Sequence, residues 1–237
     1  MIGEVLAKHL RLIGRLSDDD EAALLGIRGD IRDVPQGEDV LKEGEHPTES
    51  VVVITGLLHR YRRNPQGRRQ IHSVYLPTDA PSLETLHMEV MDNSLGALAP
   101  SRIGVIPHAE LFRVMDAHPR ILALCWRETL VQAAIFREWL MRNSQLLAHA
   151  QLAHFFCEIM TRARAAGLAS GDTCALPITL EDLGDALGMS AVHVTRTLAV
   201  LRKAGLAEFR DGTLTVLQWE PLVEIAEFDP GYLHLHR

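Results

Sequence analysis

The hydrophobic pattern divides the chain near His118-Pro119 into a strand-rich part and a helix-rich part. Before this point, short apolar runs at 51–54, 70–76 and 102–106 alternate with turns that contain glycine or proline. Several short strands at regular spacing are typical of an antiparallel roll or barrel. We therefore predict an N-terminal antiparallel β-roll, jelly-roll-like in character, over residues 1–117.

Helical patterns lie on both sides of the strand-rich stretch, which runs from about residue 30 to 116. Val5 to Leu25 is expected to form short helices with a cap at Ser17. From Arg120 to about Asn143 there is no proline or glycine, which predicts a long helix. This helix has two apolar stripes, so it is either enclosed in one core or packed between its own β domain and a second copy of the chain, the arrangement that we favour. One stripe comprises Ala123, Trp126, Leu130, Ala133, Arg137, Leu140, Ser144 and Leu147, and the other Ile121, Leu124, Val131, Ile135 and Trp139.

The most informative pattern lies between Leu176 and Val216. Thr179 is the expected N-cap of a helix that carries Leu180, Leu183 and Leu187 on its core face and stops at Gly188. Ser190 then caps a second helix with Val194, Leu198 and Leu201 as its core stripe. Two helices joined by so short a turn predict a helix-turn-helix. Residues 169–172 are expected to be a loop, and a hairpin that turns at Asp211-Gly212 supplies a wing.

The outer side of the second helix is predicted to contact DNA. The chain has a formal net charge of −7, yet Ser190 to Lys203 contains three basic residues and no acidic one. Phosphates repel carboxylates, so this distribution favours docking on DNA. Arg196 can donate two hydrogen bonds to guanine, and hydroxyls near helix starts suit phosphate oxygens. The expected DNA-binding residues are Thr179, Ser190, Ala191, Val192, His193, Thr195, Arg196, Arg202 and Lys203.

The run Asp182–Ser190, followed by Val194–Leu198 and Leu201–Leu206, closely resembles the DNA-binding motif of the Crp/Fnr transcription regulators. The resemblance extends over nearly the whole chain, because glycines 37, 44, 56 and 67 fall where that family turns its β-roll. It implies an α+β fold in which an effector-type β-roll (1–117) is joined by a dimerisation helix (118–147) to a winged helix-turn-helix domain (148–237). It also implies a homodimer on a near-palindromic operator.

The chain departs from the family pattern in the recognition helix and in the β-roll. Val192 stands where the family usually has a glutamate, and a valine can contact a thymine methyl but cannot accept a hydrogen bond. Segments 77–84 and 93–95 lack the glycines and the phosphate-pairing arginine of members that bind cyclic nucleotides, so cyclic AMP is not expected. Oxygen-sensing relatives cluster cysteines near the N-terminus, and none precedes Cys125 here, so an iron-sulfur cluster is not expected either.

Other chemistry finds little support in the sequence. The twelve histidines form no HExxH and no zinc spacing, so no metal site is expected. Haem ligation by His72, His87 or His108 would depend on the fold and stays open. Cys125 and Cys157 are interpreted as core thiols. There is no nucleophile elbow, P-loop or dinucleotide motif, and therefore no enzyme is expected.

Localisation follows from the absence of two kinds of segment. No apolar run is long enough to span a bilayer, and the first residues lack the basic and apolar regions of a secretory signal. We expect a cytoplasmic protein that does not enter the membrane.

We interpret the chain as a sequence-specific transcription regulator whose partners are double-stranded DNA and a second copy of itself, with RNA polymerase as a candidate. One alternative is a dimeric ligand-binding signalling module whose helical C-terminal domain contacts protein. Another is a constitutive regulator in which the β-roll, whose effector is unknown, is only a scaffold.

Overall fold

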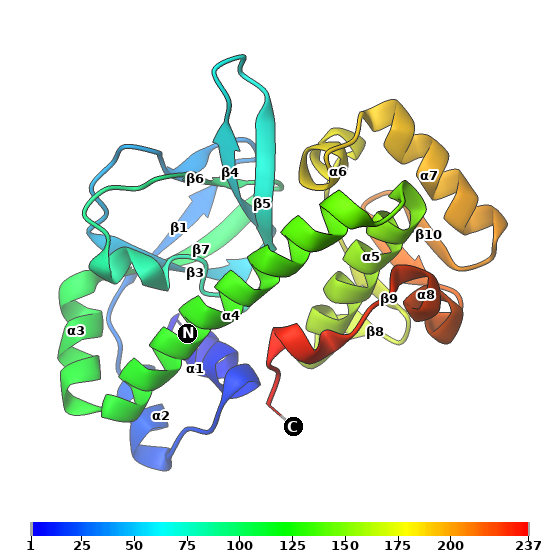
Figure 1. Ribbon diagram of the computed structural model, residues 1–237. Helices are drawn as coiled ribbons and strands as arrows, with labels where there is room; N and C mark the ends of the chain where they lie inside the picture. Colours follow the sequence, from blue (N-terminus) through cyan, green and yellow to red (C-terminus); the bar gives the residue numbers. More distant parts are fainter. Residues whose placement is uncertain (1, 237) are drawn as a thin grey trace. The chain divides into compact units, whose positions relative to one another are not determined.

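The computed structural model describes residues 2–236, which divide into two compact units (Figure 1). The first unit contains the described residues up to Arg62, then Val74–Ala133 and the residues from His234 onward. The second unit contains Arg63–Ser73 and Ala134–Leu233. The long helix α4 (Pro119–Gln145) contributes residues to both units.

The first unit is built around two antiparallel sheets, in strand orders β1-β7-β3 and β2-β6-β4-β5. Eight buried side chains from both sheets form its core: Val51, Val53, Leu58, Tyr75, Leu95, Ala97, Ile103 and Val105. The predicted β-roll is therefore confirmed. The elements of the two sheets and the helices around them are α1 (Ile2–Ile13), α2 (Asp18–Leu25), β1 (Asp30–Val34), β2 (Asp39–Leu41), β3 (Glu49–Thr55), β4 (Leu58–Arg63), β5 (Arg69–Tyr75), η1 (Leu83–His87), β6 (Ser94–Ala97), β7 (Ser101–Pro107) and α3 (His108–Ala117). The last residue of β4 and the first five of β5 are counted with the second unit.

The two predicted N-terminal helices are present. The Ser17 hydroxyl accepts a hydrogen bond from the Asp20 amide (3.2 Å), and the Asp20 carboxylate accepts one from the Ser17 amide (3.0 Å), which together close a capping box. A Cβ on Gly3 would lie 1.9 Å from the carbonyl oxygen of Leu24. The close approach of α1 and α2 therefore depends on glycine at this position.

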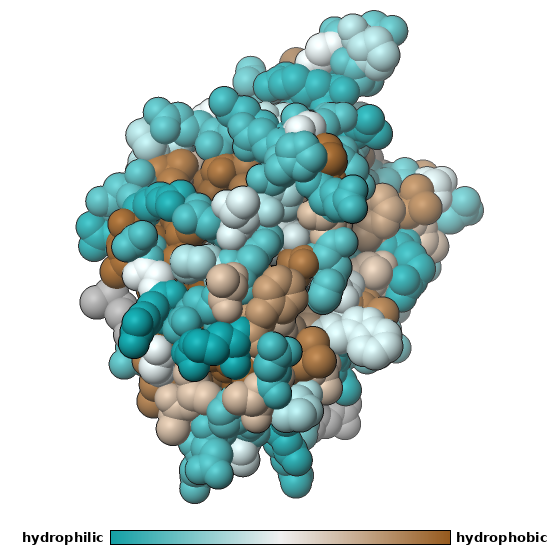
Figure 2. Space-filling model, turned by 90° about the vertical axis from the view of Figure 1, so that its left-hand side faces the viewer, coloured by the Kyte–Doolittle hydropathy of each residue, from teal (hydrophilic) through white to brown (hydrophobic). Residues whose placement is uncertain are grey.

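The two apolar stripes of α4 differ sharply in exposure. Members of the second stripe, Ile121 and Trp139 among them, are buried. In the first stripe, Trp126 is 68% exposed, Leu130 56% and Leu140 64%. Elsewhere hydrophobic exposure is more scattered, and on the face shown in Figure 2 hydrophilic residues cover most of the surface. The exposed stripe on α4 is the largest such feature on any one helix of residues 2–236, and a large exposed apolar patch marks an interaction surface.

The second unit joins a helical body to a small sheet of strand order β10-β11-β9-β8. The predicted loop at 169–172 is wrong in part, because Ala169 and Ser170 form β8, which pairs with β9 and extends the sheet. A strand of two residues is too short to leave an alternating pattern in the sequence. The elements are α5 (Ala148–Ala165), β8 (Ala169–Ser170), β9 (Thr173–Ala175), α6 (Leu180–Leu187), α7 (Ala191–Lys203), β10 (Ala207–Arg210), β11 (Thr213–Val216), α8 (Trp219–Ala226) and η2 (Pro230–Leu233).

The core of the second unit contains a buried cluster of charged and polar groups. Arg142 is fully buried, with its guanidinium 4.4 Å from the ring centre of Trp139 and its Nη1 3.9 Å from Glu158 Oε2. Glu158 accepts hydrogen bonds from Trp139 Nε1 (2.9 Å) and from the Tyr232 hydroxyl (2.8 Å). Within residues 2–236 the Arg142 nitrogens make no hydrogen bond. Burial accordingly lowers the pKa of Arg142.

His154 lies in the same cluster and is held in its neutral form. Burial, together with the charge of Arg142, lowers the pKa of His154 to about 4. Its Nδ1 lies 3.0 Å from the carbonyl oxygen of Ala226, which can accept a hydrogen bond from a neutral ring protonated at Nδ1. The Ala226 hydrogen bond and the charge of Glu158 favour the charged form, but burial outweighs them because the imidazole is almost wholly excluded from solvent.

The free energy of unfolding should therefore fall as the pH drops from about 6.5 to about 4. In this range the unfolded chain protonates His154 and the folded chain does not, a loss of at most about 1.4 kcal/mol per pH unit. Urea unfolding of His154→Gln at pH 7, 5.5 and 4.5 should show a flatter pH dependence than the unsubstituted protein. His149→Gln, on the same helix, is the control. Parallel pH profiles for His154→Gln and the unsubstituted protein would contradict the assignment.

Candidate DNA interface and the β-roll polar site

The helix-turn-helix is assembled from caps and glycines that the sequence places at fixed points. The Thr179 hydroxyl accepts a hydrogen bond from the Asp182 amide (3.1 Å) at the start of α6, and Gly188 ends that helix with a φ of +68°. The Ser190 hydroxyl accepts a bond from the His193 amide (3.2 Å) and so caps α7. A Cβ on Gly184 would lie 2.4 Å from the Met189 carbonyl oxygen. There is therefore no room for a side chain where α6 contacts the turn.

Two core assignments within this motif need correction. Leu180, expected on the core face of α6, is 37% exposed, because it lines an open depression beside α7 together with Leu198. On α7 the buried positions are Val194, Thr197 and Leu201, while Leu198 is half-buried. Thr197 tolerates burial because its hydroxyl donates to the carbonyl oxygen of His193 (2.9 Å).

The outer face of α7 is open to solvent. Of the nine predicted DNA-binding residues, Ala191 is half-buried and the other eight are exposed. Val192 is 62% exposed at the start of the helix, and Arg196 follows one turn later. The structure thus brings eight of the nine residues onto α7 and its cap, and puts Thr179 at the start of the neighbouring α6.

The predicted hydroxyls already take part in local hydrogen bonds. The Thr179 hydroxyl donates to Asp182 Oδ2 (2.7 Å), and the Thr195 hydroxyl donates to the carbonyl oxygen of Ala191 (2.9 Å). A phosphate oxygen could accept from either hydroxyl only after that bond is exchanged. The cationic side chains therefore carry more of the expected phosphate binding than these hydroxyls do.

The wing forms as predicted and contributes one residue that the sequence prediction missed. Asp211 and Gly212, with φ of +50° and +69°, make the two-residue turn between β10 and β11. Arg210, the last residue of β10, lines with Arg202 and Thr195 a depression of about 240 Å³ beside α7. A basic residue directly before an Asp-Gly turn was the available signal, since it places a cation at the tip of a wing.

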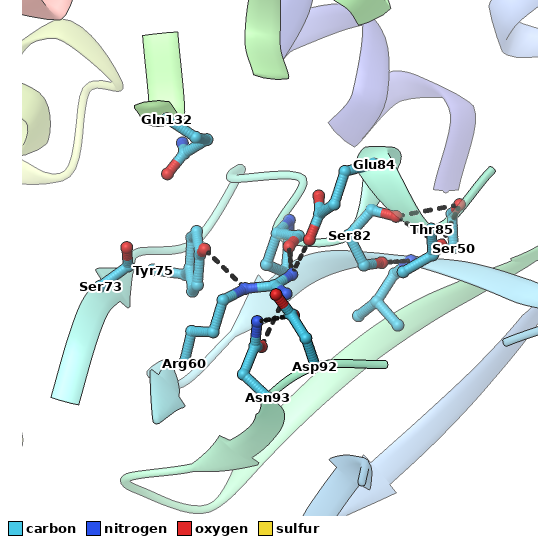
Figure 3. A network of polar contacts seen from close by, with 12 residues as sticks. Ser50, Arg60, Ser73, Tyr75, Ser82, Glu84, Thr85, Asp92, Asn93 and Gln132 are labelled. Carbon is cyan, nitrogen blue, oxygen red and sulfur yellow. Dashed lines mark hydrogen bonds and ion pairs between the residues drawn. The ribbon is translucent and has the colours of Figure 1, made fainter. Parts of the chain in front are cut away.

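A second polar site lies inside the β-roll, around Arg60 on β4 (Figure 3). Arg60 is 8% exposed, and its Nε donates to the Tyr75 hydroxyl (3.2 Å) while Nη1 donates to Asn93 Oδ1 (2.8 Å). Nη2 donates to the carbonyl oxygen of Pro81 and forms an ion pair with Glu84. Burial alone would lower the pKa of Arg60, but Tyr75 and Glu84 raise it overall. The sequence prediction found no arginine here, because it considered only residues 77–95.

The segment that carries Glu84 is fixed to the sheet by buried hydroxyls. The Ser82 hydroxyl accepts a hydrogen bond from the Val51 amide (2.7 Å), and the Thr85 hydroxyl donates to the Ser82 carbonyl oxygen (2.6 Å). Ser82 and Thr85 are both almost completely buried. The carboxylate of Glu84 is therefore presented to Arg60 from a rigid support.

The candidate cofactor ligands do not form a cluster. Within residues 2–236 no group of three His, Cys, Asp or Glu side chains could hold a metal ion. Burial raises the pKa of Cys125 and Cys157 to about 12 and that of Cys174 to about 11. His87 and His108 both contact the ring of Phe112 edge-on. His72 belongs to the other unit. None of the helices described has both the length and the apolar character that crossing a bilayer requires.

Two known protein families match the regions of the chain that contain these two sites. Residues 150–225 match the Crp-like helix-turn-helix domain, and residues 31–118 match the cyclic nucleotide-binding domain. The chain belongs to the Crp/Fnr family of DNA-binding transcription regulators. The resemblance noted from the sequence is thereby confirmed.

Individual relatives agree over most of the length of this regulator. It is 24% identical over 190 residues to "Electron transport regulator A" of Shewanella oneidensis, covering 80% of this chain and 75% of the relative. It is 27% identical over 183 residues to "Nitrogen fixation regulation protein FixK" of Bradyrhizobium diazoefficiens, covering 76% and 75%. The solved structure of FixK2 from Bradyrhizobium japonicum has the same fold, with a TM-score of 0.76 at 22% identity over 84% of this chain and 98% of that one.

The β-roll of this regulator does not fit the cyclic nucleotide that its domain family is described as binding. The amides of Thr78 and Asp79 donate to the carbonyl oxygens of Val53 and Leu76, and Pro77 and Pro81 have no amide hydrogen. This turn therefore has few amides left for a phosphate. The Glu84 carboxylate at Arg60 would repel a phosphate that approached the same guanidinium.

Proposed function

We propose that this regulator acts as a homodimer that inserts two copies of α7 into successive major grooves of one pseudo-palindromic operator. The observation that carries the proposal is the outer face of α7, which is exposed and free of carboxylates from Ser190 to Lys203. A chain of net charge −7 has no general attraction for DNA, so binding depends on this local surface.

Each residue of the face has a proposed role. Arg196 donates two hydrogen bonds to the O6 and N7 of guanine, and Val192 contacts a thymine methyl. Arg202, Lys203 and Arg210 contact phosphates. The remaining proposed contacts, at the helix starts and along the face, are made by Thr179, Ser190, Ala191, His193 and Thr195.

Selection of bound sequences from random duplex DNA tests this assignment. We expect an inverted repeat with half-sites about 10–10.5 base pairs apart between centres, each with a guanine and a thymine at fixed positions. Enrichment of a single half-site would refute the dimeric mode, and absence of any enrichment would refute sequence-specific binding. A half-site without the thymine would refute the role of Val192.

The exposed stripe of α4 is the proposed dimer face. A leucine buried in a symmetric interface contributes twice, and replacing it with aspartate adds the cost of an unpaired charge. Leu130→Asp should therefore weaken dimerisation by at least about 3 kcal/mol, roughly 150-fold in dissociation constant.

The oligomeric states of Leu130→Asp and Leu25→Asp, measured by sedimentation, distinguish a role of Leu130 in the dimer interface from a general loss of solubility. Leu25 is a similarly exposed leucine (48%) on α2. We expect the Leu25→Asp protein to remain dimeric. A Leu130→Asp protein that remains dimeric at low micromolar concentration would remove α4 from the interface.

Two further assignments follow from the proposed role. A regulator that binds operators in the bacterial chromosome works in the cytoplasm, and we place it there. RNA polymerase remains a candidate partner.

A further inference from the structure

We propose that Glu84 is the chain's own occupant of an anion site formed by Arg60, so that the β-roll holds its shape without a bound nucleotide. The idea concerns the first unit alone and does not depend on DNA binding. Its ligand class is a carboxylate, supplied by the chain itself. The domain family is described as binding a cyclic nucleotide, whereas in this chain a carboxylate of the chain itself pairs with Arg60.

The guanidinium of Arg60 is close to saturated by internal partners. A guanidinium has five N–H donors, and four of the bonds they can form go to Tyr75, Asn93, Pro81 and Glu84. An added anion would have to displace one of these groups. The acceptor that differs from the others is Glu84, since it alone carries a full negative charge.

Glu84 occupies this place at an electrostatic cost. Burial raises the pKa of Glu84, and the charge of Arg60 is the first of the two interactions that oppose this effect, the other being a backbone hydrogen bond. Asp92 adds a second negative charge close to the pair. The negative surroundings therefore favour one carboxylate at Arg60 and disfavour a phosphate diester beside it.

Hydrogen bonds of its neighbours hold Glu84 in position beside Arg60. Ser82 and Thr85, on either side of it, are fixed by the hydrogen bonds to β3 and within η1. Arg60 comes from β4 and Tyr75 from β5, so the pair ties η1 to both strands. A carboxylate at this point links three segments that an external effector would otherwise have to bring together.

Removing the carboxylate should open the site to an added one. Glu84→Ala deletes the terminal CH2–carboxylate of the side chain, and we expect it to lower the Tm by about 4–8 °C. Sodium propionate at about 100 mM should restore at least half of that loss, because it can bind the exposed guanidinium. Propionamide, of the same shape but uncharged, and sodium chloride at equal ionic strength should restore none.

Measurements of Tm on Glu89→Ala, Glu84→Gln and the unsubstituted protein complete the test. Glu89→Ala removes an exposed carboxylate from the same connection and should keep the Tm of the unsubstituted protein. The unsubstituted protein should not respond to propionate or to 1 mM cyclic AMP. Glu84→Gln, which keeps the shape without the charge, should have a lower Tm than the unsubstituted protein and gain nothing from propionate. It also serves if Glu84→Ala does not fold.

Three results would overturn the proposal. A Tm for Glu84→Ala or Glu84→Gln equal to that of Glu89→Ala overturns the proposal, as does equal rescue by propionate and propionamide. A rise of more than about 2 °C in the unsubstituted protein with cyclic AMP or propionate shows that the site admits external anions with Glu84 in place, and overturns it as well. Because the readout is Tm, failure here leaves the DNA-binding proposal untouched.

Discussion

Arg196→Ala is expected to weaken binding to the selected operator by about 1–3 kcal/mol, roughly 5- to 150-fold, and to relax the preference for guanine at one position in each half-site. The reason is geometric. A bidentate guanidinium pairs with the O6 and N7 of guanine and with no other base edge in the same way. Fluorescence anisotropy with the operator and with duplexes changed at that position measures both effects.

Arg202→Ala provides the matched comparison, because it removes a cation from the same helix without removing a proposed base contact. It should weaken binding to all duplexes alike and reduce the slope of log K against log salt by about one. Equal losses on operator and random DNA for Arg196→Ala would move Arg196 into the phosphate-binding group. An unchanged salt slope for Arg202→Ala would count against its phosphate contact.

Gly184→Ala should unfold the second unit more easily and abolish tight operator binding. Helix propensity alone predicts the opposite, since alanine stabilises a helix interior by about 1 kcal/mol relative to glycine. The added Cβ would lie 2.4 Å from the Met189 carbonyl oxygen, and that atom is backbone in a tight turn. Overpacking of this kind costs about 1–3 kcal/mol, so the clash should outweigh the propensity and shift α7 relative to α6.

Thermal unfolding and operator affinity should be measured together for this variant. Gly26→Ala is the control, because Gly26 has a negative φ and the nearest atom to an added Cβ is at 3.5 Å. We expect Gly184→Ala to lose more than tenfold in affinity and Gly26→Ala to lose none. A Gly184→Ala protein as stable as the unsubstituted one would show that the turn can move aside without consequence.

Local patterns predicted the DNA-binding motif well, because its signals are short-range. Caps, the Gly188 turn and the Asp211-Gly212 hairpin each depend on residues within four positions of one another. Where the prediction was incomplete, a distant neighbour decided the outcome. Leu180 is apolar at a position predicted to face the core, yet it lines an open depression with Leu198 and Phe209 and stays 37% exposed.

The β-roll site could not be predicted in the same way. Arg60 and Glu84 are separated by more than twenty residues, and their meeting depends on how β4 pairs with β6 and on the placement of η1. Alternation along β4 says that Arg60 shares a face with Leu58, but does not say that a carboxylate faces it. The sequence alone therefore left open both a β-roll that senses an unknown effector and a β-roll that is only a scaffold.

The Arg142 cluster restricts the order in which its members can change during evolution. Losing Glu158 alone would leave a buried cation beside two aromatic rings, a step that costs about 3–5 kcal/mol. Losing Arg142 alone costs less, because Glu158 keeps its ion pair with Arg162 at 3.3 Å. Replacing both by apolar residues of similar volume is often neutral or favourable. Descendants of this regulator should therefore lose Arg142 before Glu158 or together with it, with the loss of Glu158 alone selected against.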